Sequence, residues 1–514
     1  MFIINIAAFV FVLGLVIMLH ELGHMIMAKR AGILCHEFSI GMGPILYQKK
    51  KGETLYAIRA VPIGGFVMMA GEEVNDEMIK AGQEIRVLRD DDGVITHMIM
   101  DVNDERYPDA EKIKVDNLDL TGKDNEPLHI NGQLVDTQAY YIYKNKRLQV
   151  APYDRSFESK TLMQRFLAIV AGPLMNFILA FFLFIMIGFL TGFPQTDAQD
   201  NITNEIGIVE PSRPAEGVVE VGDRVVGVEA IDGIETWQEF SEAMSQHQGE
   251  RNLTLFLERD GEIVERTLTP NISIFSIGIS SDPGAEDPHD VIIGDVQQNT
   301  PAREAGIEGG DTILQVEDYT IETWSDLLDS MYEYDQGEML SVTVERDGET
   351  RTFEVDAYGR ELLESQGVQL ARVTIGVSPI HEFSFTQSIM AGFSGVARSS
   401  TMIIDTLRML FGGTVGVGDL AGPVGIYSLT TSAFQQGLIT LMNWVALLSV
   451  NLGILNLLPI PALDGGRIVF IGYEALTRRK VNKTVENTLH AIMFVLLIGL
   501  LLVVTYNDIL RLFN

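Results

Sequence analysis

The sequence is poor in cysteine and in basic residues. Its one cysteine, Cys35, allows no disulfide within the chain, so any domain outside the cytoplasm must fold without one. We interpret Cys35 as an ordinary small residue near a membrane surface. The chain has only 37 Lys and Arg but 70 Asp and Glu, which gives a net charge of −33. Nucleic-acid binding needs basic patches, so this balance argues against nucleic acid as a partner.

The N-terminal segment lacks two features of a cleavable signal peptide. No basic residue precedes its apolar stretch, and the stretch does not end in a small-residue cleavage site. We therefore expect a retained first helix.

The chain is hydrophobic overall in spite of its acidity. Its mean hydropathy is +0.17, and 46% of its residues are hydrophobic. The two properties coexist only if they occupy different segments. The predicted fold class is a multi-pass α-helical membrane protein with about four transmembrane helices and acidic, water-exposed domains. Its 514 residues exceed what one compact domain holds.

One metal-binding motif lies inside the first apolar segment, residues 1–30. His20 and His24 are four apart, so on a helix they share one face and can hold a zinc ion. Glu21 lies beside the place where a zinc-bound water would sit. When this motif is the only evidence for a metal site, the alternative is a surface helix that carries two solvated histidines. Ionisable residues within an apolar span are costly, which favours a functional site.

A third ligand is expected from the third apolar segment, residues 435–466. Basic residues follow both the first and third segments, which predicts that His24 and Asp464 lie near the cytoplasmic side. Two histidines, one carboxylate and an open position make a catalytic zinc site. The alternatives are that Asp464 is only a helix-terminal turn residue and that His36 is the third ligand.

Composition also divides the rest of the chain. The sequence Ala171-Gly172-Pro173 predicts a kink and close helix packing, and Asn176 either joins helices or lines the site. For the Gly-rich residues that follow the first helix, the alternative to a membrane-associated β-loop is a soluble β-hairpin. The expected segments are a membrane-associated β-loop at 37–75, a β-rich cytoplasmic insert at 76–160, transmembrane helices at 163–193 and 486–510, and an amphipathic interfacial helix and loop at 385–433.

The middle of the chain contains an internal repeat. Gly222-Asp223 recurs as Gly310-Asp311, and Trp237 recurs as Trp324, at offsets of about 87–88 residues. The copies, residues 200–272 and 290–378, resemble α+β PDZ domains. Residues 300–311 match that family's turn into its core strand, whereas residues 213–218 lack its second Ala-Gly. Such domains bind extended chain ends, although the two copies could instead be steric spacers.

Taken together, these motifs resemble the site-2 protease family of intramembrane metalloproteases, in particular its regulator-of-sigma-E protease branch. The resemblance rests on His20–His24, the Gly-rich loop through Gly71, Ala171-Gly172-Pro173, the PDZ region, and Asn456 to Gly466. The long insert looks like the Gram-positive members.

The resemblance implies Zn²⁺ on His20, His24 and Asp464, with Glu21 as catalytic base. It implies that Asn456 and the β-loop, here Gly64 and Gly65, contact a substrate presented as a strand. Implied partners are the lipid bilayer, single-span membrane substrates such as anti-sigma factors and signal-peptide remnants, and C-termini of pre-cleaved substrates at extracytoplasmic PDZ domains. The protein would be a multi-pass plasma-membrane protease acting in regulated intramembrane proteolysis.

Two other functions remain open from the sequence. A membrane scaffold that binds chain termini would not need Glu21. A metal or ion transporter would need several polar helices and a conduction path, and only about four spans are visible.

Overall fold

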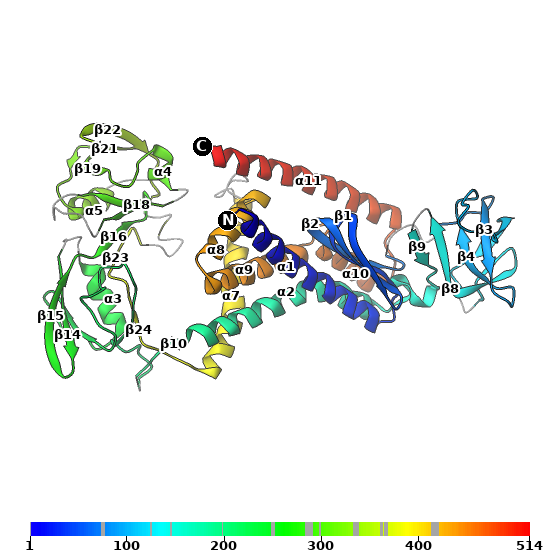
Figure 1. Ribbon diagram of the computed structural model, residues 1–514, viewed down its shortest axis with the longest axis horizontal. Coiled ribbons are helices and arrows are strands. Elements are labelled where there is room, and N and C mark those ends of the chain that lie inside the picture. The colour runs from blue at the N-terminus through cyan, green and yellow to red at the C-terminus, as the bar shows by residue number, and fades with distance from the viewer. Residues whose placement is uncertain are drawn as a thin grey trace. The chain divides into compact units, whose positions relative to one another are not determined.

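The computed structural model of the chain describes two compact units, and each is described by itself (Figure 1). One unit comprises Met1–Leu190 with Phe385–Phe513, and the other comprises Thr191–Ser384. The described residues are 2–72, 78–123, 126–143, 146–197, 199–247, 252–282, 291–297, 300–332, 339–359, 363, 369–412 and 421–513.

Four helices of the first unit are long and apolar enough to cross a membrane, as expected. A 20-residue helix rises about 30 Å, which matches the hydrocarbon thickness of a bilayer. The four are α1 (Phe2–Arg30), α2 (Leu162–Thr191), α9 (Leu438–Leu457) and α11 (Lys483–Phe513). Three further helices are α7 (Phe385–Gly412), α8 (Pro423–Gln435) and α10 (Asp464–Thr477). A loop was expected between α7 and α8, and its residues 413–420 lie outside the described part of the chain.

Helices α1 and α2 cross at two glycines. A Cβ on Gly23 would stand 2.1 Å from the carbonyl oxygen of Ala171, and a Cβ on Gly172 would stand 2.2 Å from Nε2 of His24. Small residues let helix backbones approach closely, which stabilises packing where lipid provides no hydrophobic drive. The close helix packing predicted from Ala171-Gly172-Pro173 is therefore present, and it occurs beside a candidate ligand.

The Gly-rich segment after α1 forms a compact sheet from two long, bent strands, β1 (Cys35–Lys51) and β2 (Thr54–Met69). Residues 35–40 have partners on two sides, and on one side residues 37–40 pair with residues 55–58, for example Phe38 with Tyr56. On the other side they pair with residues 65–69, for example Phe38 with Val67. The stretch 65–69 is therefore an edge strand, because it pairs with only one neighbour in the described structure.

The expected β-rich insert is a seven-stranded sheet with its own apolar core. Its order is β5-β3-β4-β8-β7-β6, with β9 also on β8. The strands are β3 (Glu84–Arg89), β4 (Ile95–Ile99), β5 (Glu111–Lys114), β6 (Leu118–Asp119), β7 (His129–Ile130), β8 (Gln133–Tyr143) and β9 (Lys146–Gln149). Two histidines lie in this sheet, His97 on β4 and His129 on β7.

The second unit contains the repeat predicted from the sequence. Each copy has a four-stranded sheet of matching order, β13-β12-β14-β15 in the first and β20-β19-β21-β22 in the second. The first copy has β11 (Ile206–Val209), β12 (Arg224–Val228), β13 (Ile231–Asp232), α3 (Trp237–Gln246), β14 (Leu253–Arg259) and β15 (Glu262–Leu268). The second has β16 (Asn271–Ile274), β17 (Ile279–Ser281), β18 (Ile293–Val296), α4 (Pro301–Ala305), β19 (Thr312–Val316), β20 (Tyr319–Thr320), α5 (Trp324–Tyr332), β21 (Leu340–Arg346) and β22 (Glu349–Val355).

A buried ion pair explains why the Gly-Asp sequence recurs. Asp223, with a side chain only 1% exposed, pairs with Arg259 at 2.7 Å. In the second copy Asp311 pairs with Arg346 at 2.6 Å in the same way. Each aspartate also accepts a hydrogen bond from the backbone amide of the residue three positions earlier, so it closes the turn that leads into the first core strand.

The first copy is not one continuous segment. After the second copy, the chain forms β23 (Ala371–Thr374), which pairs with β16, and then β24 (Val377–Pro379), which pairs with β11 of the first copy. The expected boundary at residue 272 therefore leaves out a strand that lies more than 100 residues later. A final strand, β25 (His381–Glu382), pairs with β10 (Phe193–Pro194) where the chain enters this unit.

Candidate metal centre

Three side chains predicted as metal ligands lie together. Nε2 of His20 is 3.2 Å from Nε2 of His24, and Oδ2 of Asp464 is 3.2 Å from the first nitrogen and 3.4 Å from the second. Both histidines are 6% exposed. Within the part of the chain that the structure describes, they form the one cluster of three or more His, Cys, Asp or Glu side chains with metal-ligand spacing.

The geometry follows from local structure. On α1 the i, i+4 spacing puts both imidazoles on one face. Asp464 is the first residue of α10, directly after the loop that follows α9. In that loop Ala462 has φ = 82°, which L-residues with a side chain rarely adopt, and its amide donates to Nδ1 of His490 on α11 at 2.7 Å. Helix α11 thus holds the loop that delivers the carboxylate.

The outer nitrogens of both imidazoles also have polar partners. Nδ1 of His24 is 2.8 Å from the carbonyl oxygen of Ala168 on α2, so it donates there and Nε2 keeps its lone pair. The side-chain nitrogen Nδ2 of Asn176 lies 3.2 Å from Nδ1 of His20, and its Oδ1 has no donor among the described residues. If His20 binds metal through Nε2, its Nδ1 proton needs an acceptor, which the Asn176 amide supplies with its oxygen toward the ring. Of the two roles left open for Asn176, this contact favours lining the site.

These donors fit a bound cation. Oδ2 of Asp464 is buried and has no hydrogen-bond donor among the described residues. Three lone pairs that face one another in a buried site repel unless a cation lies between them. Two imidazole nitrogens and one carboxylate oxygen are the ligand types of catalytic zinc sites.

Glu21 and Gly65 adjoin each other beside the ligands. Glu21 is half-buried on α1, and Gly65 begins the edge strand 65–69. A Cβ at Gly65 would stand 3.1 Å from Cγ of Glu21 and 2.9 Å from the carbonyl oxygen of Ser39. Gly64 has φ = 84°. Only glycine lets this strand pass so close to Glu21, and that close approach puts an unpaired strand edge next to the metal cluster.

Asn456 is not drawn into the cluster. Its side-chain nitrogen donates to the carbonyl oxygen of Leu452 one turn earlier on α9, at 3.0 Å. Its contact with substrate stays a prediction.

The remaining candidates lie elsewhere. His36 is outside the metal cluster, and burial followed by the Arg155 charge lowers its pKa to about 4. Cys35 is buried, and burial raises its pKa to about 11, which makes the thiol unreactive at neutral pH.

Two further residues near the site, Arg467 and His490, received no role from the sequence. Arg467 is one turn after Asp464 on α10 and forms an ion pair with Glu72 at the end of the β-loop. The i, i+3 spacing from Asp464 could have indicated Arg467. No local signal marks His490, because its partner Ala462 is 28 residues away.

Comparisons with known proteins agree with this arrangement. The model of peptidase family M50 matches residues 8–500. The chain is 31% identical to zinc metalloprotease RasP of Oceanobacillus iheyensis over 519 residues, covering 99% of both chains. It is 32% identical to RasP of Geobacillus kaustophilus over 514 residues, covering 99% of this chain and 98% of that one.

One solved structure, a PDZ domain protein from Parabacteroides distasonis, matches 25% of this chain and 48% of its own. It has 11% identity and a TM-score of 0.12, too low to bear on the fold. The full-length relatives and the family match, joined to the cluster that His20 and His24 on α1 form with Asp464 at the start of α10, show that the chain belongs to peptidase family M50, the site-2 protease family of membrane zinc metalloendopeptidases.

Proposed function

We propose that this protease hydrolyses peptide bonds in the transmembrane segments of single-span membrane proteins, in regulated intramembrane proteolysis. The observation that carries the proposal is the edge strand 65–69, which lies against Glu21 next to the cluster of His20, His24 and Asp464. Anti-sigma factors and signal-peptide remnants are the substrate classes that the family resemblance suggests.

His20, His24 and Asp464 would hold the zinc ion. Zinc supplies a Lewis acid that acidifies water and polarises the scissile carbonyl. Glu21 accepts a proton from the attacking water and passes it to the leaving amine as the C–N bond breaks. Asn176 and Ala168 fix the two imidazole rings from α2, so the histidines keep their orientation during the reaction.

The substrate must be extended to react. A helical segment hides its carbonyls in i→i−4 hydrogen bonds, and unwinding it in lipid leaves polar groups without partners. Adding the unwound segment as a strand beside residues 65–69 would satisfy these groups and place the scissile bond near Glu21. Asn456 would bind the same segment from α9.

We also infer a sidedness for the plasma membrane. Lys29 and Arg30 end α1, and Arg478, Arg479 and Lys480 follow α10, so these ends lie toward the cytoplasm. The tandem repeat then lies outside the cell. There it would bind the C-terminal ends of substrates that another protease has shortened.

The test compares wild type with Glu21→Gln on single-span substrates in detergent. Wild type should cleave, and added zinc should restore activity after chelation. Glu21→Gln should lose at least about 100-fold in rate, the scale of general-base catalysis, while keeping stoichiometric zinc. A Glu21→Gln protein that cleaves normally would refute the assignment. Zinc binding without cleavage by wild type would favour the scaffold function.

A further inference from the structure

Three consecutive lysines end strand β1, and exposed apolar residues come shortly before them. The side chains of Ile45, Leu46 and Tyr47 are 41%, 70% and 60% exposed. Lys49–Lys51 follow at the end of the strand and are exposed as well. In a chain with four helices that are apolar enough to cross a membrane, large exposed apolar side chains indicate contact with lipid. The strand therefore changes from a lipid-facing to a charged composition within a few residues.

The register of the sheet sets the depth of the lysines. Lys49 pairs with Tyr56 on β2, and the hydroxyl of Tyr56 accepts a hydrogen bond from Nζ of Lys29 at 3.3 Å. Lys29 and Arg30 end α1. Lysine and arginine at the end of an apolar helix extend their charged groups into the headgroup layer of the bilayer. Lys49–Lys51 therefore lie at the depth of the lipid headgroups.

The apolar residues of the same strand lie deeper. Tyr47 pairs with Ile58 on β2. Ile40 pairs with Ile58 on one side and with Gly65 on the other. A Cβ on Gly65 would stand 3.0 Å from Cγ2 of Ile17, in the middle of α1. This row of the sheet is therefore level with the apolar middle of α1, and Tyr47 lies on the hydrocarbon side of the lysines.

The seven-stranded insert adds a further cation beside the lysines. Nζ of Lys50 donates to the hydroxyl of Tyr140 on β8 at 3.1 Å and lies 4.4 Å from the centre of its ring. The guanidinium of Arg147 on β9 lies 4.1 Å from the centre of the same ring and donates to Nε2 of His97 at 2.6 Å. Burial, followed by the Arg147 charge, lowers the pKa of His97, so the imidazole is neutral at pH 7 and accepts this bond. Two cations are thus held beside one tyrosine, and each keeps further N–H donors.

No carboxylate neutralises these four cations among the residues that the structure describes. Two glutamates lie in the same hairpin, and each already holds an arginine. Glu37 pairs with Arg59 at 2.5 Å. Glu53 pairs with Arg155 at 2.6 Å through both of its oxygens. Lys49–Lys51 and the Arg147 guanidinium are therefore left to interact with an anion from outside the chain.

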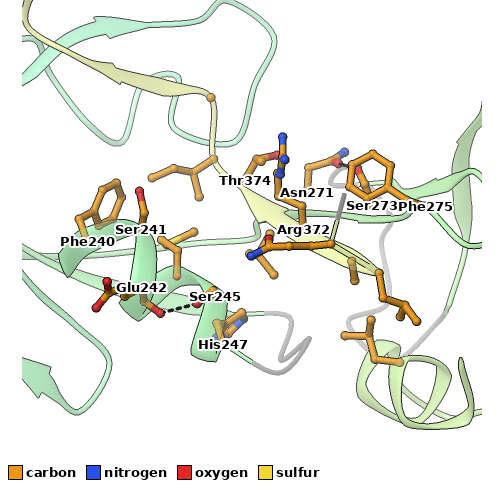
Figure 2. Close-up of a pocket in the computed structure, with 18 of the residues that line it drawn as sticks. Phe240, Ser241, Glu242, Ser245, His247, Asn271, Ser273, Phe275, Arg372 and Thr374 are labelled. Atoms are coloured by element: carbon orange, nitrogen blue, oxygen red, sulfur yellow. Dashed lines mark hydrogen bonds between the residues drawn. The ribbon is translucent and has the colours of Figure 1, made fainter. Parts of the chain in front are cut away.

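Basic residues of the tandem repeat, by contrast, lie among acidic ones. Arg372 and Glu242 both line a cavity of about 1510 Å³ in the repeat (Figure 2). Arg213 and Glu210 line it too, and they pair with each other at 3.6 Å. The chain as a whole has a net charge of −33. Four cations without a carboxylate, at one depth of the membrane, therefore predict a negatively charged ligand at that depth.

We propose that Lys49–Lys51 and Arg147 bind the headgroups of anionic phospholipids where β1 meets the insert. The lysine and guanidinium groups donate to the lipid phosphate, and the acyl chains lie along residues 45–47. Bound lipid holds β8 and β9 of the insert at the membrane surface, next to the Lys50–Tyr140 contact. Strand 45–51 pairs with residues 54–59 and forms the edge of the sheet opposite residues 65–69. The lipid site is therefore separate from the proposed substrate strand, and it does not rest on the proposed function.

The test uses the full-length protein in nanodiscs of phosphatidylcholine alone or with phosphatidylglycerol added, and it measures hydrogen exchange in β8 and β9. Exchange should be at least about fivefold slower with phosphatidylglycerol, since one basic residue near an anionic surface gains about 1 kcal/mol. Raising the salt concentration to about 1 M should remove most of this difference, because the Debye length falls to about 3 Å.

Two variants of the lysines separate charge from side-chain shape. The triple variant Lys49→Gln, Lys50→Gln and Lys51→Gln should exchange at rates within about twofold of each other in the two lipid compositions. The triple variant Lys49→Arg, Lys50→Arg and Lys51→Arg should keep the effect of phosphatidylglycerol, because arginine also binds phosphate. Zinc content shows that each variant is folded around its metal site.

A matched control removes the same charge from another part of the insert. Lys80→Gln, Lys112→Gln and Lys114→Gln together change residues on or before β5, which β3 and β4 separate from β8 in the sheet. This variant should keep the effect of phosphatidylglycerol. Equal exchange of wild type in both lipid compositions, slowing that persists at high salt, or loss of the effect in the control and not in the Lys49–Lys51 glutamine variant would each overturn the proposal. Since no cleavage is measured, such a result leaves the protease function intact.

Discussion

His490 on α11 accepts the backbone amide of Ala462 through Nδ1 at 2.7 Å, two residues before Asp464. This contact joins the fourth apolar helix to the loop that carries the candidate carboxylate ligand. Ala462 holds a left-handed backbone conformation, which costs of order 1–3 kcal/mol and persists only where its surroundings enforce it. His490 is therefore a positioning residue for Asp464.

Replacing His490 should change zinc affinity according to whether an acceptor remains. His490→Leu should weaken zinc binding by about 10–100-fold, the usual cost of losing an outer-shell partner. His490→Asn should recover most of the affinity, because its side-chain oxygen can accept the Ala462 amide. Zinc titration and the visible spectrum of the cobalt-substituted protein measure this. Equal losses in both variants would mean that the imidazole only fills space.

The crossing of α1 and α2 predicts that a glycine-to-alanine substitution on α1 affects stability differently at the crossing point and away from it. Gly23→Ala puts a methyl group 2.1 Å from the Ala171 carbonyl oxygen and should destabilise the helix pair by about 1–3 kcal/mol. Gly14→Ala meets nothing within 4 Å and should be neutral or slightly stabilising. Thermal unfolding in detergent and zinc content distinguish the two. A stable, zinc-replete Gly23→Ala protein would show that the helices do not cross at this glycine.

The identity of the third ligand can be tested directly. Asp464→Ala should lower zinc affinity by more than about 100-fold, because a side chain that binds the metal directly should matter more than the residues that only orient the ligands. His36→Ala should retain zinc, because His36 is outside the cluster. Metal content after dialysis against a weak chelator gives the answer. Zinc lost from His36→Ala and kept by Asp464→Ala would reverse the assignment.

The Asp223–Arg259 pair predicts an acid limit for the first repeat. Burial of Asp223 opposes ionisation, but the hydrogen bonds and charge of Arg259 outweigh it and lower the pKa. Because the folded pKa lies below the unfolded value of about 3.9, the pair's stabilisation is present above that value and is lost as pH falls through the folded pKa.

The measurement is hydrogen exchange in residues 206–268 of the full-length protein between pH 3 and 7. Asp223→Asn should expose these amides already at neutral pH and flatten the acid dependence, since it leaves the half-buried guanidinium of Arg259 with weaker partners. An unchanged acid profile in Asp223→Asn would assign the acid limit to another group.

The sequence determined those features that local spacing or composition encodes. The four apolar helices follow from apolar stretches that, as helices, are long enough to cross the hydrocarbon core of a bilayer. The i, i+4 histidines share a face on any helix, and the repeat followed from matching residues at a constant offset. The full-length family match confirmed the resemblance drawn from His20–His24 and the motif at Asp464.

Only the tertiary structure decided which distant residues meet. The edge of strand 65–69 beside Glu21, the amide of Asn176 on His20, and His490 on Ala462 each join segments that no local pattern connects. The pairing of β24 with β11 is the largest such case, because the strand that completes the first repeat follows the whole second repeat. Hydrophobic periodicity specifies which face of an element is buried, whereas the choice of partner depends on packing and hydrogen bonding across the folded chain.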